Sequence, residues 1–321
     1  MSELRVAIVG CGRMGRERAT AATHVGARVV EVCDTDAQRA MELAAVLPGC
    51  CARQDAGALS WPELDAVFVC SPPYTRGPVE CAAIEREVPV FMEKPVGLSA
   101  AHCLPIQTAL ERHPVLTAVG YMNRYRASVQ RARQVLANQP ILGVACHWVN
   151  GVYRVPWWRD KQLSGGPLNE QATHLIDLAR YIVGEVTEVH GLMAPAQAPI
   201  EHVHSAGVHL RFAAGPLCSM LYSCMSQTKM INFQVFTSET RVYLEGWDFH
   251  LVEDGTNEPP PLPDRTREAI FAHEVAAFLK DVAAHSRRHI LCDFTDAMKT
   301  QSVVDALQRS IETGLPCAVK G

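Results

Sequence analysis

Residues 4–15, LRVAIVGCGRMG, decide the fold. Residues 4–9 form a nearly continuous apolar run, which is typical of a parallel strand buried on both faces. The glycine-rich turn GCGRMG follows at once, a helical pattern continues to about His24, and the next apolar run ends at Asp34. This succession of strand, glycine turn, helix, strand and acidic residue is a dinucleotide-binding fingerprint, whereas the glycine motif alone would be weak evidence.

The glycines of this turn each meet a different physical need. Gly10 allows the tight turn, Gly12 lets the backbone approach a pyrophosphate, and Gly15 permits close packing of the helix against the strand. N–H groups at the start of the helix then hold the phosphates. The sequence therefore predicts a cofactor site that includes Gly10, Gly12, Arg13, Met14 and Gly15.

Asp34 bears on the choice between two nicotinamide cofactors. At the end of the second predicted strand, its carboxylate would accept hydrogen bonds from the ribose diol of the adenosine and repel a 2′-phosphate. We therefore expect NAD as the cofactor. Arg39 lies close enough in the sequence to keep NADP as the alternative.

Strand-like and helix-like segments alternate through the first part of the chain. Apolar runs at 65–70, 88–95 and 115–121 are separated by helical patterns. Such alternation predicts an α/β fold in which residues 1–122 form a Rossmann domain with a doubly wound parallel sheet.

The pattern changes in residues 123–321. Between residues 186 and 246, strand-like runs follow one another without helices between them. This predicts a C-terminal α+β domain with a large and mostly antiparallel sheet. Helices are expected at 266–285 and 294–313, and packing of these helices on the first domain is left open.

Composition and charge exclude several classes of protein. At roughly 150 residues per domain, 321 residues agree with two domains. A net charge of −4 without long basic runs argues against nucleic-acid binding. The first strand begins too early for a signal peptide, and the longest uncharged run, 212–228, indicates two strands and a turn rather than a membrane span. We expect a cytoplasmic protein whose twelve cysteines are free thiols.

Two further segments follow buried strands, namely CSPPY at 70–74 and FMEKPVG at 91–97. Open α/β sheets bind ligands at the carboxyl ends of their strands, so Ser71, Pro72, Glu93 and Lys94 join the expected cofactor site. A lysine here would point towards the cofactor, and the proline after it restricts its backbone, with a cis peptide bond as one option. The alternative is a surface lysine paired with Glu93.

The stretch SGGPLNEQATHLIDLARYIVG, residues 164–184, indicates a helix that carries a carboxylate and an imidazole. Asn169 is expected to cap this helix, which places Glu170 in its first turn, where the helix dipole favours an ionised carboxylate. The four-residue spacing sets Glu170 beside His174. The pair is either a buried structural contact or a proton relay. Imidazole suits a relay because it titrates near neutral pH. For Asp177 a structural role is expected.

These segments, together with VGYMNRY at 119–125, stand in the order that is seen in the Gfo/Idh/MocA family, named for glucose–fructose oxidoreductase, inositol dehydrogenase and rhizopine catabolism. The chain resembles this family over essentially its whole length. The E-K-P tripeptide and the G-G-x-L…H segment are more specific than the glycine motif. The resemblance implies a nicotinamide-dependent enzyme with a Rossmann domain and a C-terminal domain whose open sheet often makes subunit contacts, hence a homodimer or homotetramer.

The resemblance also assigns residues, with two departures. It places the catalytic lysine of the family at Lys94 and the catalytic histidine at His174. Glu170 stands where the family usually has an aspartate, which keeps the carboxylate but adds a methylene. Arg76 stands where many members have a histidine, so a role for that histidine does not transfer.

Other polar and aromatic residues are weaker candidates. Tyr153, Trp158 and Arg159 lie in an aromatic loop that either packs locally or forms a pocket wall for a sugar-like substrate, and Tyr121 and Arg124 are similar candidates. His202 and His204 share a predicted strand face, but two histidines without a third ligand favour a polar surface, so no metal is expected.

The sequence thus predicts an NAD(P)-dependent oxidoreductase acting on a CH–OH or C=O group of a sugar, cyclitol or related small polar molecule. As a hypothesis, His174 acts as general base, Lys94 stabilises the developing alkoxide, and Glu170 either orients His174 or holds Lys94. The alternatives are an NAD-dependent glycosidase, which the family also contains, and a catalytically silent nucleotide-binding regulator.

Overall fold

The computed structural model describes residues 3–195, 203–253 and 266–320, and these form two compact units. The first unit consists of the described residues of Met1–Gly97, Ala101–Met122 and Arg267–Ala297. The second consists of those of Leu98–Ala100, Asn123–Thr266 and Met298–Gly321. A segment near the C-terminus of the chain therefore belongs to the same unit as its N-terminus.

The first unit contains a six-stranded parallel sheet. Its strands lie in the order β3-β2-β1-β4-β5-β6, which is the doubly wound arrangement, with the order reversing between β1 and β4. The strands are β1 (Arg5–Val9), β2 (Arg28–Cys33), β3 (Cys51–Arg53), β4 (Ala66–Val69), β5 (Val90–Met92) and β6 (Thr117–Val119). Strands β1, β4 and β5 are almost wholly buried, as their apolar sequences require.

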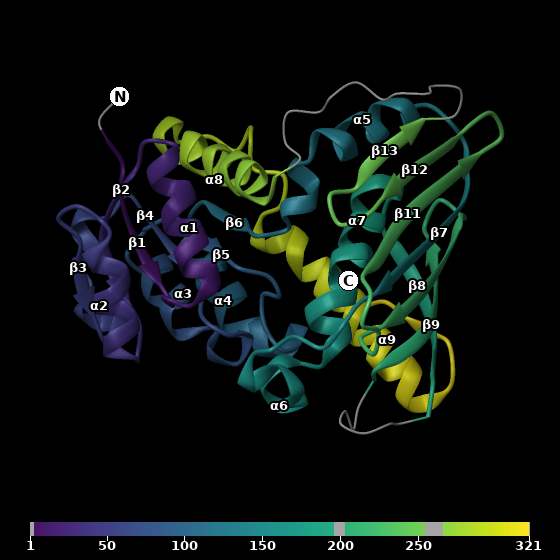
Figure 1. The fold of residues 1–321 in the computed structure, drawn as a ribbon, viewed down its shortest axis with the longest axis horizontal. Coiled ribbons are helices and arrows are strands. Elements are labelled where there is room, and N and C mark those ends of the chain that lie inside the picture. The colour runs from purple at the N-terminus through teal and green to yellow at the C-terminus, as the bar shows by residue number, and fades with distance from the viewer. Residues whose placement is uncertain (1–2, 196–202, 254–265, 321) are drawn as a thin grey trace. The chain divides into compact units, whose positions relative to one another are not determined.

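Helices pack against this sheet, and α8 lies against α1 (Figure 1). Phe278 of α8 contacts Phe68 of β4 and Phe91 of β5, with ring centroids 5.6 and 5.7 Å away. This aromatic cluster holds α8 in the first unit. The helical segments are α1 (Arg13–His24), α2 (Ala37–Ala45), α3 (Pro78–Ile84), α4 (Ala100–Arg112) and α8 (Arg267–Ala284), with short 3-10 turns at Ala56–Ala58, Trp61–Glu63 and Pro73–Thr75.

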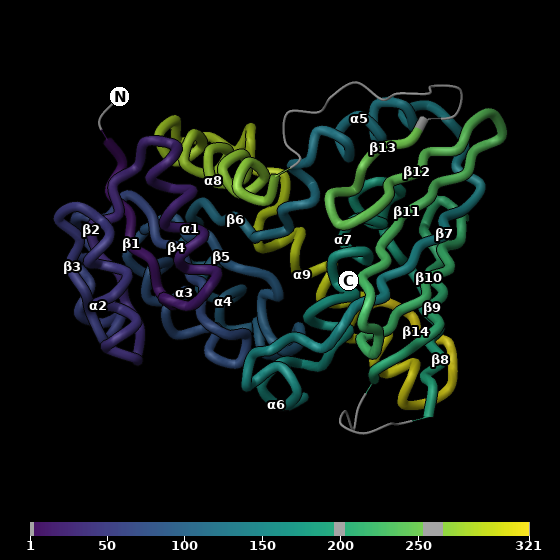
Figure 2. The backbone as a smooth tube through the Cα atoms, in the orientation of Figure 1, coloured from purple at the N-terminus to yellow at the C-terminus, as the bar shows by residue number. Residues whose placement is uncertain are grey.

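The second unit contains an eight-stranded sheet in the order β13-β12-β11-β7-β10-β9-β8-β14, whose strands run side by side in Figure 2. Within this sheet, as far as the structure describes it, only β7 and β10 pair in parallel, and the other neighbouring strands are antiparallel. The strands are β7 (Ile141–Val149), β8 (Val186–Met193), β9 (Ser205–Phe212), β10 (Leu217–Ser223), β11 (Met230–Thr237), β12 (Arg241–Glu245), β13 (His250–Glu253) and β14 (Cys317–Ala318).

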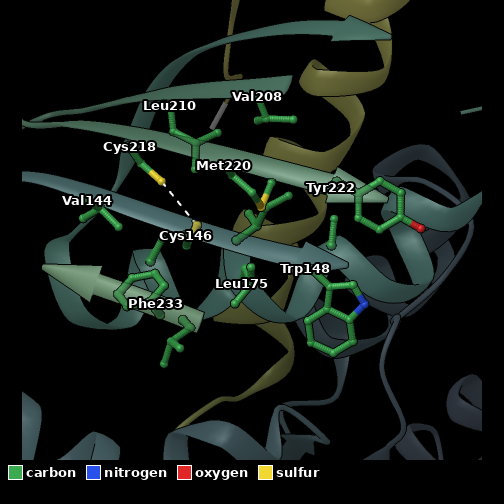
Figure 3. Packing of buried hydrophobic residues seen from close by; sticks show 14 of the residues in the cluster. Val144, Cys146, Trp148, Leu175, Val208, Leu210, Cys218, Met220, Tyr222 and Phe233 are labelled. Atoms are coloured by element: carbon green, nitrogen blue, oxygen red, sulfur yellow. Dashed lines mark hydrogen bonds between the residues drawn. The ribbon is translucent and has the colours of Figure 1, made fainter. Parts of the chain in front are cut away.

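One face of this sheet is covered and the other is open. In β9 and β10 every second residue is buried, which is the pattern of a sheet packed on one side. Side chains of neighbouring strands form one apolar layer with Leu175 of α7 (Figure 3), and in it the Cys146 and Cys218 sulfurs lie 3.8 Å apart. The helical segments here are α5 (Ala127–Leu136), α6 (Lys161–Ser164), α7 (Thr173–Val183) and most of α9 (Phe294–Thr313), with short turns at Met122–Tyr125, Pro156–Arg159 and Leu168–Ala172.

The predicted fold class is confirmed, a Rossmann sheet followed by a larger, mostly antiparallel sheet. The short strands β3, β13 and β14 were not predicted, because, unlike the equally short β5 and β6, they do not lie in longer apolar runs. In the described residues, no helix is long and apolar enough to cross a membrane.

The predicted capping role of Asn169 is wrong. A π-helical turn, Leu168–Ala172, precedes α7 and contains Asn169. The amide nitrogen of Asn169 donates to the Ser164 carbonyl oxygen, and its amide oxygen accepts from Gln301. Its side chain thus joins α9 to the turn before α7 instead of capping a helix.

Two glycines of the turn after β1 differ in the space around them, so substitution by alanine should affect the Tm at one position and not at the other. A Cβ added at Gly15 would lie 1.8 Å from the Gly10 carbonyl oxygen, whereas a Cβ at Gly12 would meet nothing within 4 Å. Overpacking usually costs about 1–3 kcal/mol, so Gly15→Ala should lower the Tm by several degrees or prevent folding, while Gly12→Ala should leave it nearly unchanged. Thermal unfolding followed by circular dichroism compares them, and equal Tm values would contradict the packing argument.

Candidate functional site

The glycine turn lies where the strand order of the first sheet reverses. Gly10 has a φ of +92°, and a Cβ there would come within 2.6 Å of the Ser71 nitrogen, at the end of β4. Its own N–H donates to the Cys33 carbonyl oxygen of β2 at 2.8 Å. The turn is therefore fixed to the ends of β2 and β4, at the position where doubly wound sheets bind their ligands.

The start of α1 suits the pyrophosphate of a dinucleotide. Gly12 is the N-cap and provides no side chain to occupy the N–H groups of the first turn, and the space beside its Cα is open. Arg13, Met14 and Gly15 form that turn, which has no acidic residue to repel an anion. A helix start of this kind binds phosphate through its N–H groups and its dipole.

Asp34 stands beside the turn, at the end of β2. Its two carboxylate oxygens accept hydrogen bonds from the N–H groups of Cys11, at 2.7 Å, and Asp36, at 2.9 Å. Each carboxylate oxygen can accept more than one hydrogen bond, so the group is still able to bind a ribose diol. Arg39 is exposed and pairs with Asp36 at 3.3 Å.

The Cys11 thiol inside the glycine motif is not a nucleophile. Burial, followed by the negative charge of Asp34, raises its pKa to about 12. The thiolate is the reactive form of cysteine, so this thiol stays inert near neutral pH. None of the twelve cysteines forms a disulfide bond, as predicted.

Glu93, expected in the cofactor site, is committed to a buried ion pair. Its carboxylate lies 2.5 Å from the Arg18 guanidinium, which also pairs with Glu274 at 2.6 Å. Burial lowers the pKa of Arg18, but the charges of Glu274 and Glu93 outweigh this and hold the pKa above its ordinary value. Lys94, next in the chain, is half-buried, and the Lys94–Pro95 peptide bond is cis.

Arg76, at the position where the family resemblance implies a histidine, is also buried. Its guanidinium donates to the carbonyl oxygens of Val69 at 2.7 Å and Glu93 at 2.9 Å, and it pairs with Glu80 at 3.4 Å. It thus connects the segments that follow β4 and β5. Ser71 is half-buried, and its hydroxyl accepts a hydrogen bond from Thr75. Pro72 is half-buried too, and it directly precedes the short 3-10 turn after β4.

In the second unit, Glu170 and His174 lie in a stretch of chain that is buried on all sides, residues 164–180. Each is only 5% exposed. The His174 imidazole stacks on the Trp148 indole of β7, with ring centroids 5.4 Å apart and planes 12° from parallel. Trp148 was not singled out from the sequence, where its burial on β7 could be inferred but its partner could not.

Tyr222 of β10, which was not predicted from the sequence, contacts the segment that contains Glu170 and His174. Its hydroxyl donates to the Gln171 side chain at 3.0 Å. Burial first, then Cys224 and the charges of Tyr153 and Glu170, raise the pKa of Tyr222 well above its ordinary value. Tyr222 therefore stays protonated and serves as a hydrogen-bond donor.

The candidate substrate residues fall into different environments. Trp158 is fully buried in the core of the second unit, and half-buried Tyr153 packs on it with centroids 5.5 Å apart. Arg159 is exposed. Tyr121 is buried in the first unit.

Arg124 was a candidate substrate residue, but its side chain has a structural contact. Its guanidinium makes a bidentate ion pair with Asp177, at 2.6 and 2.9 Å, and both side chains are almost completely buried. Asp177 also accepts a hydrogen bond from Thr300 of α9. The structural role expected for Asp177 thus includes holding Arg124.

His202 and His204 were considered for a metal site, and the described part of the chain shows no such site. His204 uses both ring nitrogens, towards the Ser205 hydroxyl and the Pro195 carbonyl oxygen. His202 lies outside the described residues. Among those described, no group of three His, Cys, Asp or Glu side chains is placed to hold a metal ion.

A doubly wound sheet with an open glycine turn at its reversal point and an aspartate after β2 defines a dinucleotide-binding protein. Comparison with known protein families identifies the family of this protein. Residues 4–121 match the model of an oxidoreductase family with an NAD-binding Rossmann fold, and residues 129–243 match the Gfo/Idh/MocA C-terminal domain. The chain belongs to the Gfo/Idh/MocA family of oxidoreductases.

Individual relatives agree with this assignment. The chain is 31% identical over 207 residues to inositol 2-dehydrogenase 2 of Mycolicibacterium vanbaalenii, a match covering 62% of the chain and 59% of that protein. The chain thus spans about three fifths of this curated relative. It is 27% identical to inositol 2-dehydrogenase of Ralstonia nicotianae, over 97% of the chain and 88% of the relative. A solved levoglucosan dehydrogenase, in complex with NADH and L-sorbose, shares the fold with a TM-score of 0.88 at 18% identity, over 100% of both chains.

The pairing of Arg124 predicts that its removal affects stability. Arg124→Met would leave Asp177 as a buried charge without its main partner, and breaking a buried ion pair typically costs about 3–5 kcal/mol. Arg159→Met, on an exposed arginine, is the matched control and should change little. Urea unfolding measures both variants, and an Arg124→Met protein as stable as the control would show that the ion pair contributes nothing.

Proposed function

We propose that this protein is an NAD-dependent oxidoreductase that transfers a hydride between the nicotinamide and a CH–OH or C=O group of a sugar, cyclitol or related small polar molecule. The observation that carries the proposal is the glycine turn, which matches the NAD-binding Rossmann model and leaves the space beside Gly12 open. The names of the relatives, inositol 2-dehydrogenases, support the substrate class.

The residues at the ends of β1, β2, β4 and β5 fit NAD. The N–H groups after Gly12 would hold the pyrophosphate and Asp34 the adenosine ribose, which favours NAD over NADP. Ser71, Pro72 and Lys94 complete the proposed cofactor site, whereas the Glu93 carboxylate is engaged in its ion pair with Arg18. When bound, NAD supplies the hydride acceptor for an alcohol substrate.

Proton handling falls to side chains of the chain itself. An imidazole nitrogen of His174 takes the proton from the substrate hydroxyl, and the Nζ of Lys94 donates a hydrogen bond to the same oxygen as negative charge develops. Glu170, buried four residues before His174, orients the imidazole. Tyr153 provides an aromatic face for the C–H side of a ring substrate, and exposed Arg159 a cation for its hydroxyls.

We also propose that the protein is a homodimer or homotetramer that assembles through the open face of the second sheet. Leu217, Leu221, Met230 and Phe236 lie on this face with 37–56% of their surface exposed. Exposed apolar side chains gathered on one face favour association. Sedimentation velocity gives the mass directly, and a monomer at micromolar concentration would overturn this proposal.

The activity is tested by incubating the protein with NAD and a panel of alcohols, namely myo-inositol, glucose, levoglucosan and L-sorbose, and following absorbance at 340 nm. A set of aryl glycosides is assayed in parallel for product release. We expect NADH to accumulate with at least one alcohol. Glycoside cleavage without NADH accumulation would instead indicate an NAD-dependent glycosidase, and cofactor binding without either reaction a regulator.

Substitution of the two proton-handling residues should separate chemistry from cofactor binding. Positioned acid–base groups contribute roughly 10²–10⁴-fold in rate, so Lys94→Ala and His174→Ala should each lower kcat by about that factor. The Kd for NADH, measured by fluorescence titration, should stay nearly constant. Wild-type turnover in both variants would show that the assignment is wrong.

A further inference from the structure

Glu93 is held by two buried arginines that grip different parts of it. Arg76 donates to its main-chain carbonyl oxygen at 2.9 Å, and Arg18 donates to its carboxylate at 2.5 Å. The two guanidinium groups come from different segments, Arg76 from the loop before α3 and Arg18 from α1. Glu93 is the residue directly before Lys94.

Each arginine is itself fixed. Arg76 also binds the Val69 carbonyl oxygen and Glu80, which ties it to β4 and α3. Arg18 lies between the rings of Phe91 and Phe271, 4.5 Å from each centroid, and its second carboxylate partner is Glu274 of α8. Neither side chain has more than 1% of its surface exposed.

The surroundings leave Glu93 little room to move. A Cβ added at Gly120, next to β6, would come within 2.9 Å of the Glu93 carboxylate and 3.1 Å of the Arg18 guanidinium. Charge-assisted hydrogen bonds inside a protein are roughly twice as strong as neutral ones. A shift of the main chain at Glu93 would therefore break several buried charge-assisted hydrogen bonds, and leaving their donors and acceptors without partners costs free energy.

We propose that Arg76 and Arg18 are positioning residues for Lys94: by fixing the main chain and the side chain of Glu93, they fix the place from which the Lys94 ammonium group reaches the reacting oxygen. The inference rests on the function proposed above for Lys94. A displacement of about 1 Å at a reacting group can cost roughly 10²-fold in rate, so the positioning is expected to appear in kcat. The arginines need not touch the substrate or the cofactor.

A double-mutant cycle between Arg76 and Lys94 tests the kinetic side. Arg76→Lys keeps a cation beside Glu80 but loses the planar fork that spans the Val69 and Glu93 carbonyl oxygens. With myo-inositol and NAD, we expect Arg76→Lys to lower kcat by ~10-fold or more and to change the Kd for NADH by less than ~3-fold. In the Lys94→Ala background the same substitution should have almost no further effect. Arg86→Lys, on an exposed arginine after α3, is the matched control.

A second measurement requires no substrate. Acylation of individual lysines with acetic anhydride, quantified by mass spectrometry, reports the environment of each amine. In Arg76→Lys and in Arg18→Lys, the rate at Lys94 should change by ~3-fold or more relative to Lys161 and Lys299, since amine reactivity follows local charge and burial. Both reference lysines are half-exposed and paired with glutamates. The Tm of each variant confirms folding, and Arg18→Lys provides the test if Arg76→Lys does not fold.

The outcomes separate this inference from the function on which it rests. Independent effects of Arg76→Lys and Lys94→Ala on kcat, or an unchanged acylation rate at Lys94 in folded variants, would overturn the positioning role. Wild-type kcat in Lys94→Ala would instead overturn the role proposed for Lys94 itself. Strong coupling in the cycle together with a changed acylation rate would support both.

Discussion

The close approach of α1 to the end of β1 is the constraint on which the first unit depends. A Cβ at Gly15 would collide with the Gly10 carbonyl oxygen. Because glycine has no Cβ, α1 can begin directly after β1. This brings the first-turn N–H groups to the reversal point of the sheet, between the ends of β1 and β4. The Cys11 N–H then bonds to Asp34, so the proposed phosphate and ribose contacts are held in register by one short turn.

The charged residues discussed above fall into two groups, those in buried ion pairs and those that are half-buried. Removing a charge from water costs several kcal/mol, and the chain offsets this by pairing Arg18 with two glutamates and Arg124 with Asp177. Residues engaged in this way stabilise or position others. Asp34 and Lys94, both half-buried, keep the accessibility that a ligand contact requires. We therefore assign the candidate chemistry to few side chains and propose that the buried ion pairs support them.

Much of the fold followed from local sequence, because strand–helix alternation and the glycine turn are short-range patterns. The roles of Gly10 and Gly15 were predictable since they depend on backbone geometry within a single turn. The ion pair of Arg124 could not be predicted, because its partner Asp177 is 53 residues away and no local pattern links them. For the same reason the stacking of His174 on Trp148, and the network around Asn169, could be found only in three dimensions.

The central claim is that the glycine turn holds the pyrophosphate of NAD, and the binding of NADH to Gly12→Ala tests it most directly. Titration of the wild-type protein and this variant, by energy transfer from tryptophan to NADH, gives both Kd values. Because the added methyl group would occupy the space of the phosphate, we predict a Kd raised by ~10-fold or more at an unchanged Tm. Equal affinity in the two proteins, or no binding of NADH to the wild type, would contradict the account.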